Sequence, residues 1–147
     1  MRTNAAGIEL IKRFEPFRPR AVHRSGVWVI GYGHTGDVEP HHVINEHQAE
    51  AILSVDLDCA ERVVLLLADG APLTENQFSA LVSFTLSAGM EAFKRSRLLR
   101  YVRAGAAVPS APWARRAASE FDVWARCGAT TDLVERRRAE RALFETV

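Results

Sequence analysis

The chain of 147 residues has 48% hydrophobic and 25% charged side chains, which is typical of one globular domain that buries its core without disulfides or a metal. Its formal net charge of +1 points to no class of partner. The longest apolar run, residues 63–68, is too short to span a bilayer, and the N-terminus lacks the apolar stretch of a signal peptide. We therefore expect a soluble single domain over residues 1–147. This domain is either a whole protein or part of a longer, membrane-attached chain.

The first predicted helix ends at a carboxylate. A cap at Thr3 or Asn4 begins it, and apolar residues at helical spacing carry it to about Phe14. Pro16 cannot continue a helix, so Glu15 is expected at the helix exit, beside apolar side chains.

A small β-hairpin is predicted next. Residues 18–23 and 27–32 are rich in β-branched and aromatic side chains, and a Ser-Gly turn signal at residues 25–26 joins them. A third short strand is expected after the Gly-His-Thr-Gly turn at residues 33–36. The sheet is too small to form the core.

The longest predicted helix covers residues 46–67. Asn45 and Gln48 have the spacing of a capping box at its start, and its apolar residues follow the three-to-four spacing that buries one face. Gly70 ends it and Pro72 prevents its continuation.

The remaining chain is predicted to be helical. Thr74 and Gln77 repeat the capping-box spacing, and the nearly uncharged residues 78–86 are expected to form a buried central helix that residues 87–89 interrupt. Three further helices are predicted: one marked by Leu98, Leu99 and Val102 and ended by Gly105, one capped by Ser110 and running to about Phe121, and a last one opened by Thr131 or Asp132, with its arginines facing solvent. One small sheet and about seven helices make an α+β domain that is mostly helical.

Four segments of the chain resemble the phage-type, T4-like lysozymes, the muramidases of glycoside hydrolase family 24. They are residues 6–15, 30–36, 76–84 and 136–144, in the family's order. The resemblance implies a lysozyme-like two-lobed domain, with a small antiparallel sheet and a long helix that bridges the lobes. It also implies an enzyme without a cofactor, which cuts the β-1,4 bond between N-acetylmuramic acid and N-acetylglucosamine in peptidoglycan.

The family's catalytic pattern is only partly present. Inverting glycan hydrolysis needs one carboxyl group as acid and a second as base. Glu15 matches the acid, but Arg24 stands at the family's Asp position and Val29 at its Thr position. A guanidinium cannot accept a proton from water, and it could pair with Glu15 and hold it ionised. His23, Asp37 or Glu39 could replace the missing base from a neighbouring position.

The resemblance assigns further residues. It implies a structural ion pair between His34 and Asp56, and a cleft lined by Thr35, Leu86 and Ser96. The five histidines and two cysteines have no metal-site arrangement, so no metal is expected, and Cys59 and Cys127 are predicted to be buried thiols.

The charges are distributed unevenly. Residues 37–75 hold nine acids and one base, whereas residues 94–141 hold twelve bases and five acids. Solvated helix faces that differ in sign would explain this, and so would a basic lobe facing an anionic polymer such as the cell wall.

Three functions therefore compete. Intact motifs outside the site favour an active endolysin with Glu15 as general acid. The losses at Arg24 and Val29 favour a degenerate muramidase domain, kept as a peptidoglycan-binding or protein-interaction scaffold, as in a muramidase-like domain of a polar scaffold in stalked bacteria. A nucleic-acid binder is the weakest, because the arginines lack interleaved aromatic residues. We favour the degenerate reading, with peptidoglycan glycan strands as partner, a protein partner if the domain is a scaffold, and no nucleic acid.

Overall fold

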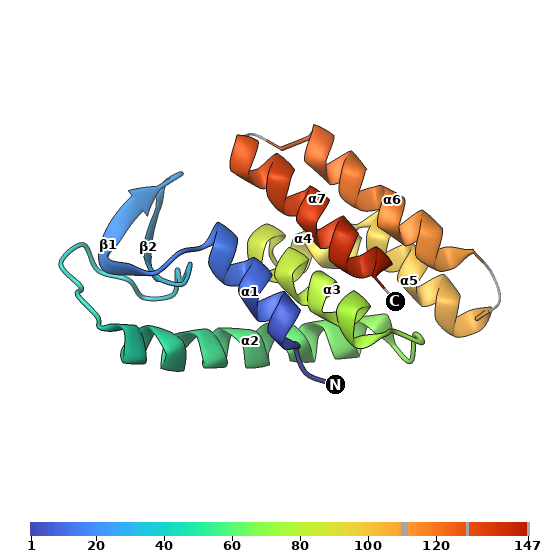
Figure 1. Cartoon of the computed structure of the whole chain (residues 1–147), viewed down its shortest axis with the longest axis horizontal. Helices are drawn as coiled ribbons and strands as arrows, with labels where there is room; N and C mark the ends of the chain where they lie inside the picture. The colour runs from blue at the N-terminus through green and yellow to red at the C-terminus, as the bar shows by residue number, and fades with distance from the viewer. Residues whose placement is uncertain (110–111, 129, 147) are drawn as a thin grey trace.

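The computed structural model describes residues 1–109, 112–128 and 130–146. Its elements are, in chain order, α1 (Ala5–Phe14), β1 (Arg18–Arg24), β2 (Val27–Gly31), α2 (Glu46–Ala68), α3 (Glu75–Ala88), α4 (Met90–Arg95), α5 (Arg97–Ala107), α6 (Trp113–Arg126) and α7 (Thr131–Glu145). The β-hairpin lies at one end, the other helices gather toward the opposite end, and α2 runs along both parts (Figure 1). The predicted fold, α+β and mostly helical with a small antiparallel sheet and a long bridging helix, is confirmed.

Helix α1 begins where a side chain can cap it. Asn4 is the N-cap, and its side chain accepts a hydrogen bond from the Gly7 amide. Thr3, the other predicted cap, instead donates from its amide and its hydroxyl to Glu61 of α2. The N-terminal segment is therefore attached to the long helix.

The hairpin is antiparallel, with Val22 opposite Val29 and Arg24 opposite Val27. Ser25 and Gly26 both have positive φ, of 49° and 80°, as the tightest two-residue hairpin turns require. The predicted third strand is wrong for the described residues, which form a two-stranded sheet. Isolated bridges join Arg20 to Val43 and Ile30 to His34 instead.

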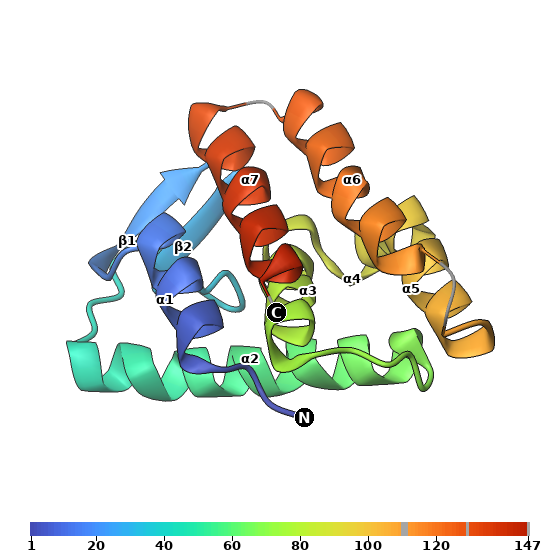
Figure 2. The same ribbon diagram turned by 45° about the vertical axis from the view of Figure 1, so that its right-hand side comes forward.

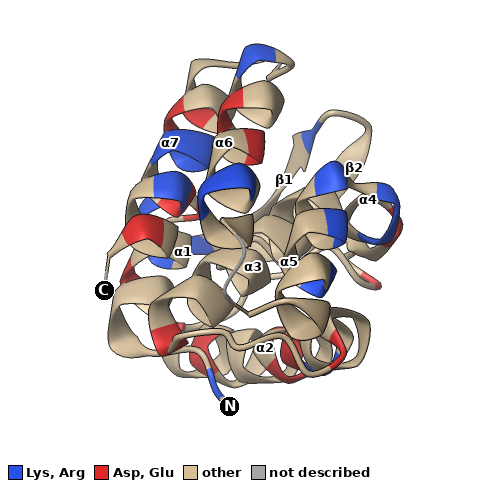
Figure 3. Cartoon of the chain, turned by 90° about the vertical axis from the view of Figure 1, so that its right-hand side faces the viewer, with Lys and Arg blue, Asp and Glu red and all other residues tan. Residues whose placement is uncertain are grey.

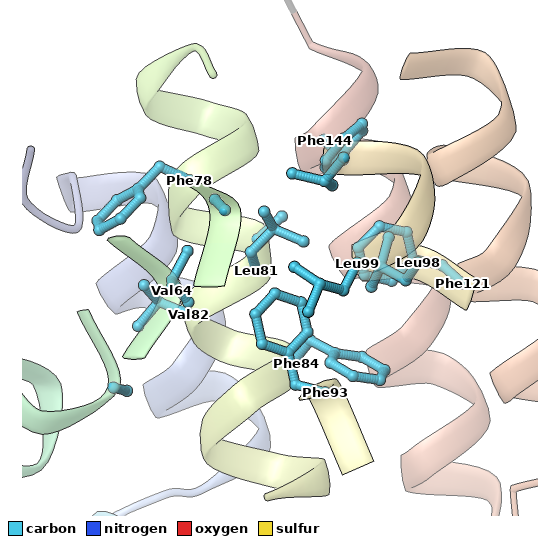
Figure 4. Close-up of a cluster of buried hydrophobic side chains, with 14 of the residues drawn as sticks. Val64, Phe78, Leu81, Val82, Phe84, Phe93, Leu98, Leu99, Phe121 and Phe144 are labelled. Atoms are coloured by element: carbon cyan, nitrogen blue, oxygen red, sulfur yellow. The ribbon is translucent and has the colours of Figure 1, made fainter. Parts of the chain in front are cut away.

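Helices α2 and α3 both start with the predicted capping boxes, at Asn45 with Gln48 and at Thr74 with Gln77. Helix α3 is the centre of the larger part, and each of its residues from 78 to 85 is buried. Phe78, Leu81 and Phe84 pack with side chains of α2, α4, α5, α6 and α7 (Figure 4). Because a charged residue there would lose its hydration, the nearly uncharged sequence of this helix follows from its place.

Two helices extend further than predicted. Helix α5 continues past Gly105, which is buried and lies against the Trp113 ring so closely that a Cβ atom would be 2.6 Å from the indole. This glycine therefore serves helix packing rather than helix termination. Helix α6 runs to Arg126 instead of Phe121. The predicted cap at Ser110 lies outside the described residues.

The prediction that the arginines of the last helix face solvent is wrong for Arg136 and Arg137, each of which is 3% exposed. Both pair with Glu140, which is fully buried one turn further along α7. Ser83 of α3 also donates to Glu140, at 2.7 Å. A buried carboxylate thus draws two guanidinium groups into the core, because an unpaired charge there would be costly.

The prediction that the two cysteines are buried thiols is also wrong, since Cys59 and Cys127 are exposed.

Acidic residues are prominent on α2, and basic ones on α4 and α5 (Figure 3). None of the helices in the described ranges is both long and apolar enough to cross a membrane.

Candidate active-site cleft

A cleft of about 300 Å³ lies between the hairpin, the end of α1 and the first turn of α7. The tip of the hairpin approaches the N-terminal end of α7 (Figure 2), and α2 and α3 supply the remaining walls. It is lined by Ile11, Glu15, Arg24, Ser25, Val27, Val29, Tyr32, Gly33, Thr35, Leu53, Asp56, Leu86, Ser87, Thr130, Leu133 and Arg136. A larger hollow of about 580 Å³, between α6 and α7, contains none of the predicted site residues.

Glu15 is held by the end of α1 and by a glycine turn. As the C-cap of the helix, its amide donates to the Ile11 carbonyl at 2.8 Å. Its side chain lies against Gly33, where a Cβ atom would be 2.8 Å from Glu15 Cγ. Gly33 has φ +82°, so both its conformation and this close approach require a residue without a side chain.

Three arginines converge on the Glu15 carboxylate. Oε2 accepts hydrogen bonds from Arg18 Nη1 at 2.9 Å and from Arg24 Nη1 at 3.1 Å. Arg136 Nη1 lies 3.7 Å from Oε1. The carboxylate that the sequence predicts as an acid is therefore surrounded by permanent positive charge.

Arg24 and Val29 face the cleft from the hairpin. Arg24 ends β1, its side chain is 45% exposed, and its guanidinium reaches back to Glu15. Val29 is 6% exposed and lines the wall of the cleft from β2. The structure therefore brings together all three residues of the altered catalytic pattern.

The proposed substitutes for a base are not among the cleft-lining residues. The rings of His23 and Trp28 are 5.1 Å apart, and Glu39 lies 3.9 Å from His42. Asp37 is likewise absent from the lining. Besides Glu15, the carboxylate that does line the cleft is Asp56.

Asp56 is engaged by His34. His34 Nδ1 lies 2.9 Å from Asp56 Oδ2 and 3.1 Å from Oδ1, and His34 Nε2 lies 2.8 Å from the Gly36 carbonyl. Both ring nitrogens therefore face oxygen atoms, which fixes the orientation of the ring. These contacts join the glycine turn to α2.

The three predicted ligand-binding residues occupy different places. Thr35 and Leu86 line the cleft from opposite sides. Ser96 does not, because it is buried at the start of α5, where its hydroxyl donates to the Phe93 carbonyl and accepts from the Leu99 amide. Its contacts are those of a helix cap.

Sequence reasoning missed Arg18 and Arg136 as partners of Glu15. The three-residue separation of Glu15 and Arg18 was a usable signal, whereas Arg136 reaches the site from the far end of the chain. Burial lowers the pKa of the Arg136 guanidinium from its ordinary value, while Glu140 acts in the opposite direction. Arginine starts from so high a value that Arg136 remains charged.

Tyr32 forms part of the cleft floor and packs its ring edge beside Phe17. Burial raises the pKa of its hydroxyl to about 12, and the nearby carboxylates of Glu50 and Glu46 act in the same direction. Lys12 lies over the Tyr32 ring, 4.7 Å from its centroid.

Residues 1–109, 112–128 and 130–146 contain no group of three or more His, Cys, Asp or Glu side chains placed to hold a metal ion.

Known proteins resemble this chain over nearly its whole length. Residues 12–140 match the family model described as Phage lysozyme. The chain is 41% identical over 153 residues to an endolysin of Bacillus phage B103, covering 99% of this chain and 55% of that protein. It thus spans about half the length of this relative.

Two further matches cover both partners almost completely. An endolysin of Acyrthosiphon pisum secondary endosymbiont phage 1 is 38% identical, with 99% of each chain covered. Among solved structures, the muramidase domain of SpmX from Asticaccaulis excentricus superimposes with a TM-score of 0.85 at 37% identity, covering 99% of this chain and 98% of that one.

Proposed function

Because the chain belongs to the phage lysozyme family, we propose that it is a peptidoglycan-directed domain that binds glycan strands but has lost most or all of their hydrolysis. One observation carries this proposal. A guanidinium, that of Arg24, lies 3.1 Å from the Glu15 carboxylate in the place where the family's reaction needs a second carboxylate.

The missing group is the base. An inverting glycosidase places two carboxyl groups roughly 6.5 to 9.5 Å apart, and the second removes a proton from the attacking water. Arg24 cannot do so, because it has donors only and stays charged at any relevant pH. Val29 adds to the loss, since a methyl group stands where the family has a hydroxyl that helps to hold that water.

The surroundings of Glu15 also oppose the acid role. A general acid must carry a proton before it donates one to the leaving oxygen. Oε2 already accepts hydrogen bonds from Arg18 and Arg24, and Arg136 approaches Oε1, so each oxygen faces a cation. At least one of these contacts would have to be given up before an oxygen of Glu15 could donate to a leaving group.

Sugar binding does not depend on the lost groups. The cleft remains open, and four residues that bear hydroxyl groups line it: Ser25, Thr35, Ser87 and Thr130. The Ser87 and Thr130 hydroxyls also accept hydrogen bonds, from Arg137 and from the Leu133 amide. Hydrogen bonds from such groups, rather than the catalytic carboxylates, give a glycan its affinity. Binding without cleavage is therefore chemically consistent with this site.

The alternative is an active endolysin, which the 41% and 38% identity to phage endolysins favours. Glu15 would be its general acid. Its base would have to come from the remaining cleft carboxylate, Asp56, which is bonded to His34. A protein-interaction scaffold is the other alternative, and it too would dispense with the catalytic pair.

Two measurements on purified peptidoglycan separate these functions. We expect the parent chain to sediment with insoluble peptidoglycan and to release no dye from dye-labelled peptidoglycan, with a commercial lysozyme as the positive control. Glu15→Gln should behave alike in both assays. Robust dye release by the parent that Glu15→Gln abolishes would establish the endolysin instead, and failure to sediment would favour the protein scaffold.

A further inference from the structure

In the ion-pair network around Glu15, guanidinium groups outnumber carboxylates. Four guanidinium groups, those of Arg18, Arg24, Arg136 and Arg137, share two carboxylates, those of Glu15 and Glu140. Within the described part of the chain, the ion pairs of these six groups are made with one another. Of these six groups, Glu15, Arg24 and Arg136 line the cleft, and the further cleft carboxylate, Asp56, is paired with His34. More than one guanidinium therefore faces the single carboxylate of Glu15, which favours an anionic ligand beside it.

Of the three arginines that contact Glu15, Arg24 has the most exposed side chain. The side chains of Arg18 and Arg136 are 21% and 4% exposed, and both already stand against the carboxylate. Arg24 is 45% exposed and bonds Glu15 through Nη1 alone. Most of its five N–H donors remain free for a ligand in the cleft.

The wall beside Arg24 is apolar. Val27 lies directly opposite Arg24 in the hairpin, and both line the cleft together with Val29. Val27 is 45% exposed, so its methyl groups are accessible to a ligand. The site thus places a guanidinium next to valine methyl groups.

We propose that Arg24 binds the lactyl carboxylate of a peptide-free N-acetylmuramic acid residue, with the lactyl methyl group against Val27. The lactyl arm carries a methyl and a carboxylate on one carbon, which matches both features of this wall. N-acetylglucosamine lacks the arm. Arg24 therefore makes the cleft selective for muramic acid without a stem peptide, an inference that rests on the proposed glycan binding.

Calorimetric titration with two soluble sugars tests this. One is the peptide-free tetrasaccharide of alternating N-acetylglucosamine and N-acetylmuramic acid, and the other is chitotetraose, which has no carboxylate. A third sample is the first tetrasaccharide with its carboxylates converted to methylamides. Each is titrated into the parent chain, Arg24→Gln, Arg24→Lys and Arg20→Gln, an exposed arginine of the same strand that does not line the cleft.

The parent should bind the muramyl tetrasaccharide roughly fivefold more tightly than chitotetraose or the methylamide, as expected for one half-exposed charged pair. Arg24→Gln should remove this preference, so that it binds the three sugars with similar affinity, whereas Arg24→Lys and Arg20→Gln should keep the preference. Equal affinity of the parent for charged and uncharged sugars, or a preference that survives in Arg24→Gln, would overturn the inference while glycan binding itself still stood. If the parent binds neither sugar nor insoluble peptidoglycan, both proposals are wrong.

Discussion

Arg24 Nη1 of the hairpin and Glu15 Oε2 at the end of α1 lie 3.1 Å apart, so an ion pair lies in the cleft where the proposed function considers a second carboxylate to be missing. Glu15 can occupy this place only because Gly33 leaves room for its side chain. The position of the carboxylate and its pairing with Arg24 are thus separate properties of the site, and each can be tested alone.

Gly33→Ala should destabilise the fold by about 2–4 kcal/mol, because the new Cβ atom would lie 2.8 Å from Glu15 Cγ in a left-handed backbone conformation. Gly26→Ala is the matched control: its φ is +80°, but a Cβ atom there meets nothing within 4 Å. It should cost about 1 kcal/mol. Urea unfolding of both variants measures the difference, and equal losses would show that the contact with Glu15 is not tight.

Glu140→Ala should cost about 3–5 kcal/mol, because it leaves the buried guanidinium groups of Arg136 and Arg137 without their shared carboxylate. Glu135→Ala, an exposed carboxylate of the same helix, should change the free energy of unfolding by less than about 0.5 kcal/mol. Denaturant unfolding compares the two. A loss for Glu140→Ala as small as that of the control would mean that the arginines find water or other partners.

His34 and Asp56 should act mainly on stability. In a double-mutant cycle of His34→Ala and Asp56→Ala, we expect a coupling of about 1–2 kcal/mol, since both side chains are only 26% exposed. Peptidoglycan sedimentation should be unchanged in properly folded His34→Ala. If that variant kept its melting temperature but lost sedimentation, the structural role would be wrong.

The hydroxyl group of Tyr32 should lose its proton at a higher pH than an ordinary tyrosine does. Because its pKa is raised to about 12, the ultraviolet titration of the two tyrosines should contain one component with that midpoint, and Tyr32→Phe should remove it. The folded state resists ionisation that the unfolded state undergoes near pH 10, so this contribution to stability is intact below about pH 10 and is lost as the pH rises toward 12. A parent titration without a late component would contradict the buried hydroxyl.

Local signals were sufficient for most of the fold. Asn45 with Gln48 and Thr74 with Gln77 predicted two helix starts, because a capping box is a contact within four residues. Gly105 misled, since its role is to admit the Trp113 ring, and no local pattern shows such a contact. The burial of Arg136 in α7 was missed for the same reason. A helix rich in charged residues was expected to face solvent, but Arg136 pairs with the buried Glu140, which also accepts a hydrogen bond from Ser83 of α3.

The site was predictable in part. Glu15, Arg24 and Val29 were found through their resemblance to the family pattern, and the structure brings them into one cleft. Arg136 could not be linked to Glu15 from local sequence, because 121 positions separate the two, and only the packing of α7 against α1 and α3 brings them together.

In the proposed function, Arg24 and Val29 are the residues that prevent cleavage. Removing general-base assistance alone lowers a rate by about 10² to 10⁴, so restoring both groups should be detectable.

Dye release from peptidoglycan by Arg24→Asp combined with Val29→Thr is therefore the most direct measurement. We expect no release by the parent, release by this double variant, and none once Glu15→Gln is added. Release by the parent that Glu15→Gln abolishes would contradict the account, because another residue would then be acting as the base.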